Sequence, residues 1–162
     1  MRHGLTFNLW NKLKSPSGFD VKMEQTTAGG FEYRGRGFRF TTATCSLDTH
    51  GDLFVEATGD RCGLRLVGVP FPGVASLGDL PGRVWEPDAD ELAIHADVFA
   101  EGGLKVRNLE LWITGGRIAC TRFDTERRLL VIAFRLDVQD GEYGREDEVD
   151  GVANCHTPPT DN

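Results

Sequence analysis

The sequence contains no long hydrophobic run. No stretch approaches the roughly 20 apolar residues that a membrane-spanning helix needs. The first 18 residues also lack an apolar run of the length found in a secretory signal. These absences argue against a helical membrane span and favour a cytoplasmic protein.

Cysteine is scarce and scattered. The four cysteines, Cys45, Cys62, Cys120 and Cys155, form no Cys-X-X-Cys pair, which excludes a zinc ribbon and a thioredoxin-like motif. In a reducing cytoplasm we expect four free thiols. Cys155 lies in a polar C-terminal segment, so we expect it to be exposed.

Complete metal motifs are missing as well. Residues 46–57 have a glycine at the sixth position of a calcium loop, but Ala57 stands where the bidentate acid belongs. Cys45, Cys62 and His50 are a chemically sound zinc set, but they lack the close spacing of structural zinc sites. We therefore predict no metal and no cofactor.

A complete catalytic motif is also absent. The sequence around Ser76 resembles a nucleophile elbow, but Val74 stands where that motif has glycine. The strand–helix context that an elbow needs is not indicated either. We therefore predict no catalytic residue and favour a non-enzymatic protein over an enzyme.

Turn-forming residues and short apolar runs are abundant. The 162 residues include 20 glycines and seven prolines, with 40% hydrophobic and 27% charged residues, a composition typical of one globular domain. β-branched and aromatic runs bounded by Gly, Asp and Asn indicate antiparallel strands. Strands are predicted at 19–24, 31–47, 53–57, 61–69, 104–113, 117–123 and 129–136.

These strands predict a mainly β fold, an antiparallel meander that forms a β-barrel or a β-sandwich. The run 129–136 is almost continuously apolar, which indicates a central strand buried on both faces. Gly115 and Gly116 predict a two-residue hairpin turn. The predicted core consists of Phe38, Phe40, Leu53, Val55, Leu64, Leu66, Leu109, Leu111, Ile113, Ile118, Leu130, Ile132 and Phe134.

Two segments allow a helix. For residues 88–101, Asp88 and Glu91 make a capping-box-like start, whereas apolar alternation over 92–98 fits a strand, which we slightly favour. Leucines at helical spacing within residues 5–13 allow a short N-terminal helix.

Charge is unevenly distributed along the chain. Residues 1–40 carry seven basic and three acidic residues, and residues 79–101 carry one basic and seven acidic residues. Residues 139–162 carry seven acidic residues and one arginine. We predict a single β-rich domain over 1–138, followed by an acidic, disordered tail over 139–162.

This segregation favours a non-enzymatic β-domain that binds a macromolecular partner through charged faces. A protein is the expected partner, with nucleic acid as the less favoured class. The basic face contains Arg34, Arg36 and Arg39. The segment 36–40 partly matches an RNA-recognition signature, but Arg39 stands where a small residue is expected. The acidic face contains Asp88, Asp90, Glu91 and Asp97.

Two alternatives remain. The Gly- and Pro-rich segment 68–82 is suited to be the lid of a small-ligand-binding barrel, with Phe71 and Trp85 at its mouth. The carboxylates of segment 79–97 are suited to the acid–base chemistry of a small hydrolase.

Overall fold

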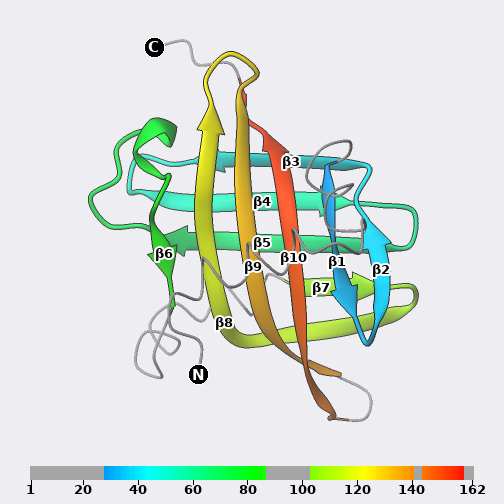
Figure 1. Ribbon diagram of the computed structural model, residues 1–162. Coiled ribbons are helices and arrows are strands. Elements are labelled where there is room, and N and C mark those ends of the chain that lie inside the picture. Colours follow the sequence, from blue (N-terminus) through cyan, green and yellow to red (C-terminus); the bar gives the residue numbers. More distant parts are fainter. Residues whose placement is uncertain (1–27, 87–102, 141–143, 159–162) are drawn as a thin grey trace.

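The fold is a closed β-barrel, as the mainly β prediction allowed. The computed structural model describes residues 28–86, 103–140 and 144–158, which contain ten strands (Figure 1). Seven of these strands close in the order β10–β3–β4–β5–β7–β8–β9 and return to β10. The strands are β1 (Gly29–Tyr33), β2 (Arg36–Arg39), β3 (Thr42–Leu47), β4 (Asp52–Thr58), β5 (Cys62–Pro70), β6 (Val84–Trp85), β7 (Gly103–Val106), β8 (Leu109–Asp124), β9 (Leu129–Asp140) and β10 (Glu146–His156).

Helical structure is minimal in the described ranges. They contain one short 3-10 turn, η1 (Leu77–Asp79), between β5 and β6. The possible helices at 88–101 and near the N-terminus lie outside the described residues.

Two sets of strands cross to make the barrel. Figure 1 shows β8, β9 and β10 running across β3, β4 and β5. The barrel closes where His156 of β10 pairs in parallel with Thr44 of β3. On the other side, the 16-residue strand β8 pairs with β7 near its start and with β9 over most of its length. The β1–β2 hairpin extends the sheet from the edge of β10.

The core matches the predicted apolar alternation. Every predicted core residue is buried except Leu109, which is partly buried beside the β7–β8 turn. Phe134, Ile132 and Leu130 of β9 are fully buried. The residues between them, Val131 and Ala133, are buried too, which confirms the two-sided burial predicted for this strand.

The interval between the predicted strands 31–47 and 53–57 is a turn, which joins β3 to β4. Asp48 begins the β3–β4 turn, and its Oδ1 accepts hydrogen bonds from the backbone N–H groups of Asp52 and His50 at 2.9 and 2.8 Å. The hydrogen bonds from Asp52 and His50 hold the pKa of Asp48 below its ordinary value. The short carboxylate therefore forms the turn through its own backbone, as residues of this type do.

Three predictions about strand continuity are wrong. The predicted strand 104–113 is divided into β7 and β8 by the turn at Arg107–Asn108. The predicted strand 31–47 is divided into β1, β2 and β3 by turns at Arg34–Gly35 and Phe40–Thr41. Gly115 and Gly116 do not form a hairpin turn, because β8 continues through both residues. A bulge between Ile113 and Gly115 lets the strand bend there instead.

The prediction of a disordered tail is wrong for residues 144–158. β9 continues past residue 138 to Asp140, and β10 pairs with β9 along its whole length. Cys155 is fully buried rather than exposed. The acidic composition of this segment predicted disorder, but the segment forms a strand. Asp150 is neutralised by an arginine on the neighbouring strand, and small apolar residues occupy the inward positions.

Candidate functional site

Five arginines gather at one end of the barrel. Arg34, Arg36 and Arg39, the predicted basic residues, lie on the β1–β2 hairpin. Arg61 from the β4–β5 turn and Arg107 from the β7–β8 turn join them. Two adjoining clefts of about 460 and 500 Å³ share Arg36, Phe38 and Arg107 in their linings. We call these five arginines the arginine face.

Backbone contacts hold the three turns together. The N–H of Arg107 donates to the carbonyl of Arg61 at 2.7 Å, and the thiol of Cys62 donates to the carbonyl of Arg39 at 3.3 Å. Gly59 packs so closely on Arg39 that a Cβ atom would lie 2.0 Å from its carbonyl oxygen. These contacts are made by main-chain atoms and the Cys62 thiol, so none of them uses a guanidinium group.

Two of the arginines occupy an unusual backbone conformation. Arg34 and Arg107 have φ values of 52° and 57°, in the left-handed region. Each begins a two-residue turn, since Tyr33 pairs with Arg36 and Val106 pairs with Leu109. Glycine, asparagine and aspartate are the residues that such turns favour. An arginine costs about 1–2 kcal/mol there, and strain of this kind is concentrated at functional sites.

Among the described residues, only Arg34 of the arginine face forms an ion pair with a carboxylate. Arg34 Nε donates to Asp147 Oδ2 at 2.7 Å, and this bond raises the pKa of Arg34. Burial alone would raise the pKa of Asp147, but the hydrogen bond from Arg34 brings it below its ordinary value. Among residues 28–86, 103–140 and 144–158, no carboxylate forms an ion pair with the other four arginines, all of which are exposed.

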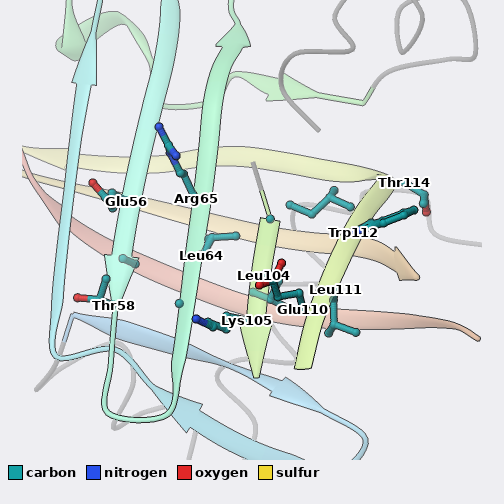
Figure 2. A pocket seen from close by; sticks show the side chains of 14 residues that line it. Glu56, Thr58, Leu64, Arg65, Leu104, Lys105, Glu110, Leu111, Trp112 and Thr114 are labelled. Carbon is teal, nitrogen blue, oxygen red and sulfur yellow. The ribbon is translucent and has the colours of Figure 1, made fainter. Parts of the chain in front are cut away.

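Beside the arginine face, the outer surface of β4, β5, β7 and β8 is hollowed into a groove of about 810 Å³. Figure 2 shows Arg65 on β5, Lys105 on β7 and Trp112 on β8 around it. The floor is formed by Gly63, which pairs with Lys105, and by Gly103, which pairs with Arg65. Because these two positions have no side chain, the outer surface is open between the walls. We call this the Trp112 groove.

Trp112 is exposed to an unusual degree. Its exposed fraction is 60%, whereas Trp85 is 5% exposed. Leu111 and Ile113 on either side of Trp112 point into the core, so strand alternation places the indole on the outer surface. Trp112 is not among the candidate residues predicted from sequence, although its place in this alternation already indicates an outward position.

The structure does not bring Phe71 and Trp85 to a mouth. They are 3% and 5% exposed and belong to the core cluster. Large side chains such as Phe40, Phe134 and Leu66 also fill the barrel interior. The predicted acidic face (Asp88, Asp90, Glu91, Asp97) lies outside the described residues.

The zinc set considered from sequence is not brought together. Cys45 lies in the core beside Cys155, Cys62 begins β5, and His50 lies in the exposed β3–β4 turn. Burial raises the pKa of the Cys62 thiol to about 11, with the charge of Asp60 adding to the effect. In the described part of the chain, no group of three His, Cys, Asp or Glu side chains is arranged to hold a metal ion. All four cysteines are free.

A second charged surface lies on β9 and β10. Asp137 stands directly opposite Glu148 in the ladder. Burial raises the pKa of Asp137, and the charges of Glu148 and Glu146 raise it further against the opposing effect of Arg135. Like charges in this arrangement destabilise a sheet. The described residues therefore carry an acidic surface made of residues that the sequence did not select.

We expect Asp137→Asn to stabilise the protein at pH 7. The folded state binds the Asp137 proton more tightly than the unfolded state, so this group favours folding at acid pH and loses that contribution as the pH rises through the raised pKa. Removing the charge should raise the unfolding free energy by about 0.5 kcal/mol at pH 7, since solvent screens the pair. Urea titrations at pH 7 and pH 3 should show the gain at pH 7 alone. Glu126→Gln, at an exposed turn, is the control. An equal gain at both pH values would contradict the argument.

No family model, no curated protein and no solved structure matches this chain. Within residues 28–86, 103–140 and 144–158, no helix has the length and hydropathy needed to cross a membrane.

Proposed function

We propose that this protein is a non-enzymatic binding domain that takes an anionic stretch of a macromolecular partner on its arginine face. The observation that carries the proposal is the convergence of five exposed arginines from three separate turns, whereas Asp60 is the one acidic residue of the described ranges that lines their two clefts. The fold keeps them together with backbone contacts, although their mutual repulsion opposes this arrangement.

Arginine is well suited to this role. Its planar guanidinium presents five N–H donors in a fork that matches the oxygens of carboxylate or phosphate. The carboxylates of an acidic protein segment, the partner favoured from sequence, and the phosphates of a nucleic acid both fit these donors. A positive surface of this kind also speeds encounter with an anionic partner at low salt.

Reversing the charge of Arg36, Arg39 and Arg61 to glutamate should abolish most polyanion binding. With heparin as the probe, we expect Kd at 50 mM salt to rise at least tenfold. We also expect the slope of log affinity against log salt to become shallower by about 2, because fewer counterions are displaced. Fluorescence anisotropy at several salt concentrations measures both quantities.

The matched control reverses three other exposed arginines, Arg83, Arg122 and Arg127. It makes the same change in net charge, so binding should weaken by less than threefold. Circular dichroism should show both variants folded, since exposed substitutions rarely change stability by more than about 0.5 kcal/mol. Equal losses in both variants would mean that net charge, and not the arginine face, determines binding.

A further inference from the structure

We infer that the partner is a single-stranded nucleic acid, with a base stacked on Trp112 and phosphates along the arginine face. This inference rests on the proposed function, because it assigns the chemistry of the same anionic partner. Trp112 provides the feature that separates nucleic acid from an acidic protein segment.

The indole of Trp112 is placed to receive a planar ring. The ladder pairs Leu104 with Leu111 and Lys105 with Glu110, so the position opposite Trp112 is Gly103. The backbone does not require a glycine at position 103. Its φ is not left-handed, and a Cβ atom there would lie 3.7 Å from the carbonyl oxygen of Leu111, which is an ordinary contact. Among the described residues, the missing side chain leaves space beside the indole on the β7 side, whereas Gln139 of β9 pairs with Trp112 on the other side.

The Trp112 groove adjoins the arginine face along β5 and β7. Lys105 of the groove precedes Arg107 by two residues, and Gly63 of the floor follows Cys62, which lines the arginine cleft. Arg107 lies four positions after Gly103, which corresponds to roughly 13 Å along the strand. At about 3.4 Å per stacked nucleotide, a single strand of about four nucleotides spans that distance.

The remaining groove side chains fit bases better than a uniform polyanion. Arg65 stands opposite Glu56 and Lys105 stands opposite Glu110 in the ladders, so the groove is balanced in charge and offers both donors and acceptors. Glu56 and Glu110 would repel the charged side chains of an acidic peptide, whereas bases are neutral and offer N–H groups, such as N3–H of thymine, to carboxylate acceptors. Accessible base faces are a property of single strands, where stacking on aromatic side chains tolerates any sequence.

The experiment compares four probes on the full chain: a deoxythymidine 12-mer, its duplex with a deoxyadenosine 12-mer, heparin and poly-glutamate. We expect Trp112→Ala to weaken binding of the 12-mer roughly tenfold and to leave heparin binding unchanged. Trp112→Phe should restore most of the affinity, because phenylalanine retains an aromatic face. Val84→Ala, at the other exposed large apolar residue of the described ranges, is the control and should bind like the wild type.

Tryptophan fluorescence gives an independent readout. Stacking of thymine on Trp112 should quench part of the emission of the wild type, and Trp112→Phe should lose that quenching. Heparin has no bases, so it should bind without quenching. Trp85 is buried and should contribute equally in both proteins.

The outcomes separate this inference from the proposed function. If heparin binds through the arginine face but Trp112→Ala leaves binding of the 12-mer unchanged, the inference is overturned and the proposed function stands. Tighter binding of poly-glutamate, or equal binding of a duplex, also overturns the inference. An equal loss for heparin and the 12-mer would assign Trp112 a structural role and overturn it too. If none of the probes binds, the proposed function itself fails.

Discussion

Asp150→Ala is expected to lower the unfolding free energy by about 3–5 kcal/mol, because it leaves a buried guanidinium without its partner. Asp150 on β10 stands directly opposite Arg135 on β9, and their exposed fractions are 7% and 8%. Arg135 donates through both Nε and Nη2, the latter at 3.0 Å from Asp150 Oδ2. A loss of this size is a large part of the 5–15 kcal/mol that stabilises a typical domain.

The arginine cannot escape by losing its charge. Burial lowers the pKa of Arg135, but the hydrogen bond and charge of Asp150, with the charges of Glu148 and Asp137, raise it above its ordinary value. A guanidinium stays protonated at any pH at which the protein folds. Removing Asp150 therefore leaves a charged group in a site with little access to water.

An exposed ion pair on the same strand is the matched control. The side chains of Arg34 and Asp147 are 41% and 31% exposed, so Asp147→Ala should cost less than about 1 kcal/mol. Urea unfolding of the two variants measures the difference. The double variant Arg135→Met/Asp150→Val should recover most of the stability, since an apolar pair can replace a buried ion pair. Equal costs for Asp150→Ala and Asp147→Ala would contradict the burial argument.

The Arg135–Asp150 ion pair also explains why β10 could not be predicted from its own sequence. Local composition counts Asp150 as one more acid in an acidic segment, and only the pairing of β9 with β10 supplies Arg135. Prediction succeeded where the stabilising contacts are local. The Asp48 carboxylate accepts a hydrogen bond from the Asp52 N–H within the β3–β4 turn, and the apolar residues of β4 alternate as predicted. Strand identity thus followed from periodicity wherever no distant partner was needed.

The candidate site, too, could be predicted only where its residues are close in sequence. Arg34, Arg36 and Arg39 are close in sequence, so their cluster was predictable. Arg61 and Arg107 join them only because β5 pairs with β7, which places the two turns side by side. No local pattern carries that information.

The bend in β8 depends on a single glycine. Figure 1 shows β8 curving from beside β7 to run alongside β9. Gly116, just after the bulge between Ile113 and Gly115, has φ +124°, and a Cβ there would lie 2.2 Å from the carbonyl oxygen of Arg135. Gly115 has no such restriction, because its Cβ would first meet the Asp137 side chain at 3.3 Å. Of the two glycines that predicted a hairpin turn, Gly116 is therefore required by the backbone, whereas Gly115 can be replaced.

Gly116→Ala should cost about 3 kcal/mol or more, because backbone strain and a clash with main-chain atoms act together. Gly115→Ala should cost less than about 1 kcal/mol, since the carboxylate of Asp137 can move and alanine reduces the entropy of the unfolded chain. Thermal melts and urea titrations of both variants provide the comparison. Similar stabilities of the two variants would show that β8 does not need a glycine at residue 116 to bend. A large loss at residue 116 alone would locate the corner of the barrel at one residue.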